Sequence, residues 1–173
     1  MLETLISNKT RIKLLLRFFL NPEVESYLRE LGRDFKETNN AIRVELNRFE
    51  KAGVVVSYRD GNRKYYKANL DYPLFTEFQQ MAMKHFGLDQ VLDQIVKKLG
   101  KIQKVYLTGE LSNGLNSQII DLVIIADEID RNYLAALTTK VEEEISRKIR
   151  SLVLSPEEEN LVPVPNVLLF AQE

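Results

Sequence analysis

The stretch TNNAIRVELNRFEKAGVVVSYRDGNRKYYKAN, residues 38–69, decides the expected fold of the first half of the chain. Apolar residues recur in it at helical spacing between Thr38-Asn39-Asn40, which can cap a helix, and Gly53, a typical stop residue. Two β-branched and aromatic runs follow, separated by Arg59-Asp60-Gly61-Asn62-Arg63, whose central glycine suits a tight turn. We therefore predict a helix over about 39–52 that leads directly into a basic hairpin.

The predicted helix has two different faces. Ile42, Leu46 and Phe49 share one side and should point inward. The other side is polar, rich in amides and basic, and consists of Asn40, Arg43, Val44, Asn47 and Lys51. Asparagine can pair with adenine edges, arginine with guanine edges, and lysine or arginine with phosphates. Such a face is either solvated or reads a DNA major groove, and the basic hairpin after it favours DNA.

Two more helices are expected upstream of this one. Apolar residues recur at helical spacing after Ser7, which can cap the first helix, and they are Ile12, Leu15, Leu16 and Phe19. Asn21-Pro22-Glu23 is a second helix start, with a capping side chain, a proline and an early carboxylate. We predict that the second helix runs to about residue 35 and buries Val24, Tyr27, Leu28 and Leu31.

Three helices and a basic hairpin resemble the winged helix-turn-helix domain of ArsR- and MarR-type transcriptional regulators, over about residues 7–69. The recognition helix of that family ends in leucine, leucine, glutamate, alanine, glycine, and leucine or valine. Its counterparts here are Leu46, Phe49, Glu50, Ala52, Gly53 and Val54, and the "gly, arg, lys, tyr, tyr" wing is matched by Gly61, Tyr65 and Tyr66.

The resemblance implies a site for double-stranded DNA. The helix at about 39–52 would enter the major groove, and the wing at 57–66 would lie on the backbone or in the minor groove. The residues implied to approach bases are Asn39, Asn40, Arg43 and Asn47. Those implied to hold backbone or minor groove are Arg48, Lys51, Arg59, Asn62, Arg63 and Lys64. The other interpretation is a winged helix that makes only protein contacts.

The charge of the chain is unevenly distributed. Residues 1–70 contain 14 Lys and Arg against 9 Asp and Glu, a balance of +5, although the whole chain has a net charge of −1. Residues 71–173 have a balance of −6. This asymmetry predicts that only the front half meets a polyanion. Because dimers match palindromic half-sites, we also expect a homodimer.

Composition excludes several other classes of site. The chain has no cysteine and one histidine, so we expect no disulfide and no zinc site. We also expect no other metal and no cofactor. Its apolar N-terminal run is interrupted by Lys13 and Arg17, and its longest uncharged stretch, residues 160–172, contains two prolines and is short for a membrane span. We expect a cytoplasmic protein without a membrane partner. Nothing in the sequence indicates a small-molecule effector.

The rear half changes its pattern at about residue 102. Helical spacing from Pro73 to Leu99, with a break at Gly87, predicts a helical linker over 71–101 that could take part in dimerisation. Strands are expected at 105–107, 119–126, 152–154 and 167–170, and a helix at 132–148. The expected class is α+β, with a winged helix-turn-helix at 1–70, the linker, and a small α/β domain at 102–173.

The small α/β domain resembles polymerase-beta-type nucleotidyltransferases. In that family a strand ends in Gly-Ser, a loop ends in glycine, and the next strand contains Asp-x-Asp. The matching segments are Val105-Tyr106-Leu107-Thr108-Gly109-Glu110-Leu111-Ser112-Asn113-Gly114 and Ile120-Asp121-Leu122-Val123-Ile124. Fusion of a winged helix to such a unit is a known arrangement, so the resemblance extends over nearly the whole chain.

The departures of this domain from the family's pattern predict that it is not an enzyme. The family uses paired carboxylates to hold magnesium at the nucleotide phosphates. Here Asp121 matches the second aspartate, whereas Ile119 takes the place of the first and Glu110 that of the serine. We expect Gly109 and Asp121 to mark a remnant nucleotide pocket, with no catalytic residue. The acidic runs 142–144 and 157–159 are expected to be solvated.

The function expected from the sequence is therefore that of a DNA-binding transcriptional regulator. Its non-catalytic nucleotidyltransferase-like domain would serve in dimerisation or sensing. One alternative is a divergent, antitoxin-like nucleotidyltransferase that modifies a small molecule, RNA or a protein. Another is an interaction module that uses both domains to hold a partner protein.

Overall fold

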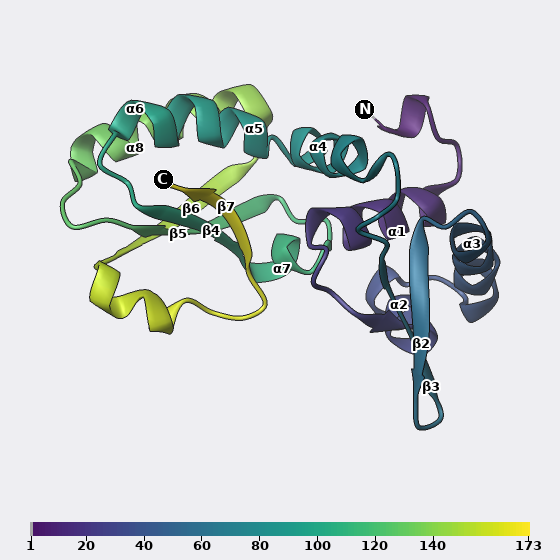
Figure 1. The fold of residues 1–173 in the computed structure, drawn as a ribbon. Helices are drawn as coiled ribbons and strands as arrows, with labels where there is room; N and C mark the ends of the chain where they lie inside the picture. The colour runs from purple at the N-terminus through teal and green to yellow at the C-terminus, as the bar shows by residue number, and fades with distance from the viewer. Residues whose placement is uncertain (1) are drawn as a thin grey trace. The chain divides into compact units, whose positions relative to one another are not determined.

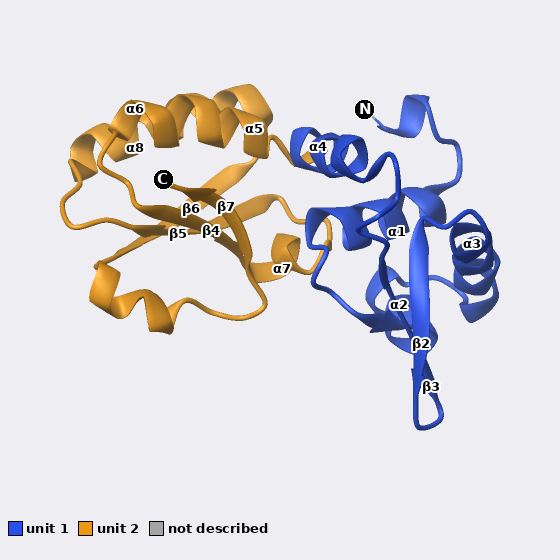
Figure 2. Ribbon diagram, in the orientation of Figure 1, with its two compact units in different colours: residues 1–85 blue, residues 86–173 orange. Residues whose placement is uncertain are grey.

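The computed structural model describes residues 2–173 and confirms an α+β class. The chain divides into two compact units, residues 1–85 and 86–173 (Figure 2). The helices on either side of Gly87 therefore fall into different units, whereas the sequence suggested one linker over 71–101.

The first unit combines helices with a small antiparallel sheet (Figure 1). Its strand order is β1-β3-β2, so the chain adds a short first strand to the hairpin formed by the other two. The elements are η1 (Leu2–Thr4), α1 (Lys9–Leu20), β1 (Ser26–Tyr27), α2 (Leu28–Phe35), α3 (Asn39–Lys51), β2 (Val55–Asp60), β3 (Arg63–Ala68) and α4 (Phe75–Phe86).

Helix α3 forms as its sequence predicts. The Thr38 side chain accepts a hydrogen bond from the Ala41 N–H and caps the first turn. Gly53 follows the helix with φ of 75°, a conformation that glycine adopts at little cost. Ile42 and Leu46 are at most 1% exposed and form the inward face. The hairpin follows at once, with Gly61 in its turn.

The prediction for the second helix was wrong at its start. No helix begins at Asn21; Ser26 and Tyr27 instead form β1 and pair with Tyr66 and Tyr65 of β3. This pairing satisfies backbone groups that a longer helix would have bonded internally. Helix α2 begins only at Leu28, and of the four residues expected to be buried only Leu31 is. The first helix is capped by Asn8, not Ser7.

The second unit contains a four-stranded mixed sheet of order β6-β5-β4-β7, in which β5 and β6 are parallel and the other pairs antiparallel. The elements are α5 (Leu88–Val91), η2 (Leu92–Val96), α6 (Lys97–Leu99), β4 (Lys104–Thr108), α7 (Gly109–Ser112), β5 (Ile119–Ile125), α8 (Arg131–Ile145), β6 (Lys148–Leu154), η3 (Pro156–Leu161) and β7 (Val167–Ala171). Strand β6 begins at Lys148, earlier than the strand expected at 152–154.

The helices α5, η2, α6 and α8 cover one face of this sheet (Figure 1). Val105, Leu107, Ile120 and Ile124 point into that layer and are fully buried. By strand alternation, Tyr106, Asp121 and the residues paired with them lie on the opposite face. Within residues 2–173 no helix has the length and hydropathy needed to cross a membrane.

Candidate nucleic-acid interface

A cationic cleft lies between helix α3 and the β2–β3 hairpin of the first unit. Its volume is about 660 Å³. Three elements contribute to it: the start of α2, the outward face of α3, and the hairpin. The lining residues are Tyr27, Leu28, Arg29, Arg43, Asn47, Arg59, Asn62, Arg63, Lys64 and Tyr66. Half of these side chains are cationic, and none is acidic.

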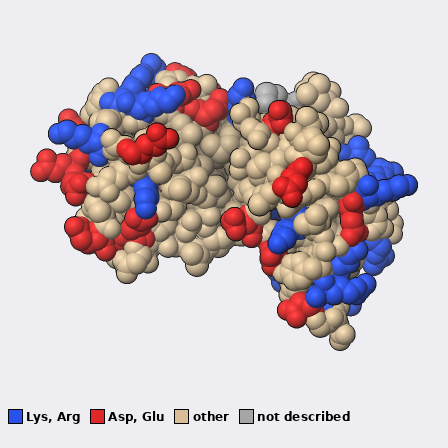
Figure 3. All heavy atoms as spheres, viewed as in Figure 1, with Lys and Arg blue, Asp and Glu red and all other residues tan. Residues whose placement is uncertain are grey.

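Lys and Arg side chains gather over α3 and the hairpin on the face drawn in Figure 3. Four arginines of the cleft, Arg29, Arg43, Arg59 and Arg63, form no ion pair with any residue of the described chain. Arg63 instead lies with its guanidinium 4.6 Å from the centre of the Tyr27 ring. Since unpaired cations favour an anionic ligand, the cleft is suited to bind phosphates.

Glu50 joins helix α3 to both strands of the hairpin. It accepts a hydrogen bond from the Ser57 hydroxyl on β2, and its Oε2 lies 2.9 Å from Lys64 Nζ on β3. The hydrogen bond from Ser57, with that from Lys64, lowers the pKa of Glu50. The same bond to Glu50 raises the pKa of Lys64. These two bonds connect the helix to both strands of the hairpin.

The structure brings together six of the ten residues predicted to contact DNA. These are Arg43, Asn47, Arg59, Asn62, Arg63 and Lys64. Asn39, Asn40, Arg48 and Lys51 are exposed on α3 but do not line the cleft. Asn39 lies at the tight approach of α2 to α3, where a Cβ on Gly32 would come within 2.6 Å of its Oδ1.

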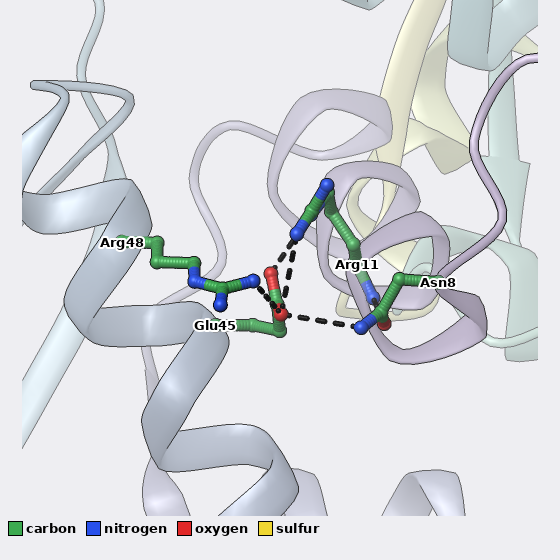
Figure 4. A network of polar contacts seen from close by, with 4 residues as sticks. All are labelled: Asn8, Arg11, Glu45 and Arg48. Carbon is green, nitrogen blue, oxygen red and sulfur yellow. Dashed lines mark hydrogen bonds and ion pairs between the residues drawn. The ribbon is translucent and has the colours of Figure 1, made fainter.

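Arg48 is held by a buried carboxylate on its own helix (Figure 4). The Glu45 side chain is 3% exposed, and its oxygens accept hydrogen bonds from Asn8, Arg11 and Arg48 at 2.8–3.4 Å. Hydrogen bonding to Glu45 raises the pKa of Arg11. This network attaches α3 to α1, because Asn8 and Arg11 belong to the first helix and its cap.

Four residues of the cleft were not among the predicted DNA contacts, although one of them, Tyr66, lies in the predicted wing. They are Tyr27, Leu28, Arg29 and Tyr66. Tyr27, Leu28 and Arg29 reach the cleft because Ser26–Tyr27 pairs with β3 and sets the start of α2 beside the hairpin. The helix predicted from Asn21 left no place for this strand, because the pairing of Ser26–Tyr27 with β3 has no local sequence signal.

In the second unit, Asp121 does not stand alone. Arg150 lies directly opposite it in the β5–β6 register, and its Nε and Nη2 donate to the two carboxylate oxygens at 2.6 and 2.9 Å. A Cβ on Gly109 would overlap Asp121 Oδ2, so only glycine permits the carboxylate to take this position. The contact of Arg150 with Asp121 was not predicted, because β6 was expected to begin after Arg150.

The two acidic runs are only partly solvated, which corrects the sequence-based expectation. Glu142 accepts a hydrogen bond from the Ile149 N–H at 2.7 Å, and this bond lowers the pKa of Glu142. Glu159 bonds Lys104, which lowers the pKa of Glu159, and also Tyr106. Nowhere in residues 2–173 do three or more His, Asp or Glu side chains gather in a geometry that could hold a metal ion.

No family model, curated protein or solved structure matches the chain.

Proposed function

We propose that the chain is a DNA-binding transcriptional regulator that acts through its first unit. The cleft between α3 and the hairpin is the observation that supports this most directly. It is about 660 Å³ in volume and has five cationic and two amide side chains but no acidic one. Phosphates provide the negative charge that the cleft lacks, and base edges provide hydrogen-bond partners for its amide side chains.

The order of the elements also supports a winged helix-turn-helix. Helix α2 leads through a short turn into α3, and the β2–β3 hairpin follows within a few residues. In this arrangement α3 is the recognition helix and the hairpin is the wing. Gly32 lies close to the Glu37 carbonyl in the turn between α2 and α3, and the Glu37 N–H donates to the Gly32 carbonyl at 3.0 Å.

The proposed roles follow from the position of each side chain. Arg43 and Asn47 project from the middle of α3 into the cleft and would read base edges. Arg59, Asn62 and Arg63 extend from the wing toward the backbone or minor groove. Arg29, at the start of α2, is added as a phosphate contact. Arg48 is assigned to the backbone only if it leaves Glu45.

We further propose that the second unit is a non-catalytic, nucleotidyltransferase-like domain. The positions at which the family resemblance expects paired metal carboxylates contain Ile119 and Asp121, and Arg150 lies opposite Asp121 on the neighbouring strand. Both oxygens of Asp121 are engaged by Arg150, whose positive charge stands where a cation would otherwise bind. The chain would act as a homodimer on palindromic DNA, in the cytoplasm.

A selection from a pool of random duplexes, followed by anisotropy titration of the recovered duplex, tests the DNA-binding proposal. We expect an affinity that falls steeply with salt. Arg43→Ala should weaken binding to the selected duplex by about 10- to 100-fold, and binding to a scrambled duplex much less. The matched control is Arg131→Ala, an exposed arginine of the second unit, which should bind as the parent does. Failure to bind any duplex at low salt, or equal behaviour of the two variants, would refute the proposal.

A further inference from the structure

Strand β6 leaves one edge of the second sheet without a partner strand. The sheet order ends at β6, whose only strand neighbour within residues 2–173 is β5. The Lys148 N–H donates to Gln118 on the β5 side, and the Leu154 carbonyl accepts from Ala126 on that side. Since backbone groups alternate along a strand, those of Ile149, Ser151 and Val153 point away from the sheet.

Only the first of these outward groups has a described partner. The Ile149 N–H donates to Glu142 of α8 at 2.7 Å. Ser151 is exposed, and Leu152 beside it is 53% exposed. An open run of backbone donors and acceptors flanked by an exposed leucine is a template for another strand.

The opposite edge of the same sheet is protected. Strand β7 is shorter, its ladder with β4 is interrupted by a register shift at Val105/Tyr106, and Pro163 and Pro165 precede it. Bulges and prolines are common means of keeping an edge from pairing. Unpaired backbone groups are therefore accessible along β6, whereas the β7 edge is protected against pairing.

The charges around β6 identify the strand that would fit it. Arg147 lies just before its start, whereas Glu157 and Glu158 follow its end. Lys148 and Arg150, near the start, are already paired with Glu142 and Asp121 of the same chain. A strand with a basic start and an acidic end is complementary to a second copy of itself when the two run antiparallel. Parallel pairing would place like charges together.

We infer that two copies of this chain associate through antiparallel pairing of their β6 strands, about a two-fold axis at Ser151. In this register Ser151 lies opposite Ser151 of the second copy, and Ile149 lies opposite Val153. The outward groups of the two Ser151 residues then pair with each other, and the Val153 N–H pairs with the Ile149 carbonyl of the other copy. The Ile149 N–H would exchange Glu142 for the Val153 carbonyl of the other copy. Arg150 would lie opposite Leu152 of the second copy, with its charge already neutralised by Asp121 of its own chain.

This inference deepens the homodimer part of the proposed function, because it assigns the surface through which the copies join. It does not depend on DNA binding. The experiments below contain no DNA, so a failure here would leave the DNA-binding proposal to be judged by its own titration.

Cysteine cross-linking tests the register directly, because the chain has no cysteine of its own. Directly opposed residues of a hydrogen-bonded antiparallel pair have Cα atoms about 5.5 Å apart, within the range of a disulfide. We expect Ser151→Cys to form a covalent dimer under mild oxidation at micromolar concentration. Val153→Cys, on the same edge, would lie about 13 Å from its own copy and should not cross-link efficiently.

Ser151→Pro tests the backbone pairing without a new cross-link. The Ser151 N–H points away from β5, so proline removes no bond of the native ladder and the fold should persist. Light scattering should give twice the chain mass for the parent, and circular dichroism should verify the fold of the variant. We expect the dimer dissociation constant of Ser151→Pro to rise at least about tenfold. A monomeric parent, a dimer unaffected by Ser151→Pro, or equal cross-linking of the two cysteine variants would each overturn the inference.

Discussion

Arg150 grips Asp121 with two parallel hydrogen bonds, at 2.6 and 2.9 Å, from directly opposite positions on neighbouring strands. The hydrogen bond to Asp121 raises the pKa of Arg150, so the guanidinium stays charged under all ordinary conditions. A carboxylate held in this way has its oxygens directed at a side chain, and a metal ion would have to displace that side chain to bind.

Removing the charge of Asp121 should therefore change little. The Arg150 side chain is 67% exposed, and exposed ion pairs contribute weakly to stability. Asp121→Asn should keep DNA affinity and shift the melting temperature by no more than about 2 °C. Incubation with labelled ATP and magnesium should yield no transfer in parent or variant. Transfer by the parent that Asp121→Asn abolishes would establish an enzyme instead.

The two sides of the cleft should differ in what they recognise. Arg59→Ala, on the wing, should weaken binding to all duplexes by the same factor. It should also reduce the slope of log affinity against log salt by about 1, because one phosphate contact is lost. Asn47→Ala, on α3, should leave that slope unchanged and relax base preference at one position. Titrations at several salt concentrations on selected and scrambled duplexes measure both. The assignment fails if Arg59→Ala changes base preference as Asn47→Ala does.

The Glu45 network should contribute to the stability of the first unit. Glu45→Ala removes a buried acceptor of hydrogen bonds from Asn8, Arg11 and Arg48, and should cost about 1–3 kcal/mol in the free energy of unfolding. Arg11 and Arg48 are partly exposed and can be resolvated, which limits the loss. Arg48→Ala is the matched control and should cost less than about 1 kcal/mol. Chemical denaturation measures both, and equal losses would argue against the network.

Acid should weaken the link between α3 and the wing. The pKa of Glu50 is lower in the folded state than in the unfolded chain, so the unfolded chain binds the proton more readily. The stabilisation is complete above the unfolded pKa of about 4.3 and is lost as pH falls through the lower folded value. Melting temperatures between pH 3 and 6 should therefore fall less steeply for Glu50→Gln than for the parent. Parallel curves would show that Glu50 gains no stability from Ser57 and Lys64.

Gly109 should resist substitution more than Gly61, a glycine of positive φ with open space around it. Alanine there would adopt an unfavourable backbone conformation, with φ of 69°, and its Cβ would overlap Asp121. Gly109→Ala should cost about 1–3 kcal/mol. Gly61→Ala is the control, since its φ is also positive at 58° but nothing lies within 4 Å of the added Cβ. If denaturation gave the same loss for both, the contact with Asp121 would be unimportant.

The parts of the fold that could be predicted are those with complete local signals. Helix α3 has its cap, its apolar period and its stop within one short stretch, so both of its ends were predictable from Thr38 and Gly53. Strand β1 was missed because its partners, Tyr65 and Tyr66, are distant in sequence and two residues give no period. Proline is common both at the start of helices and in turns, and Pro22 lies in a turn here.

The site residues also differ in whether local sequence signals could predict them. Arg43 and Asn47 could be predicted because a helical wheel places them opposite the buried stripe. The burial of Glu45 could not, because it depends on Asn8 and Arg11 of another helix. Arg150 was missed for a related reason: its role depends on which residue of β5 it faces, and strand register is fixed by the whole sheet.

The attachment of α3 to the hairpin through Glu50 has a consequence for how a duplex would be chosen. Because Ser57 and Lys64 bond the hairpin to the helix, they favour one spacing between Asn47 and the residues at the hairpin tip. A duplex whose groove width departs from that spacing would have to bend or narrow in order to fit. The cost of such a deformation depends on the stiffness of its base steps. Base pairs that no side chain touches would then still influence affinity.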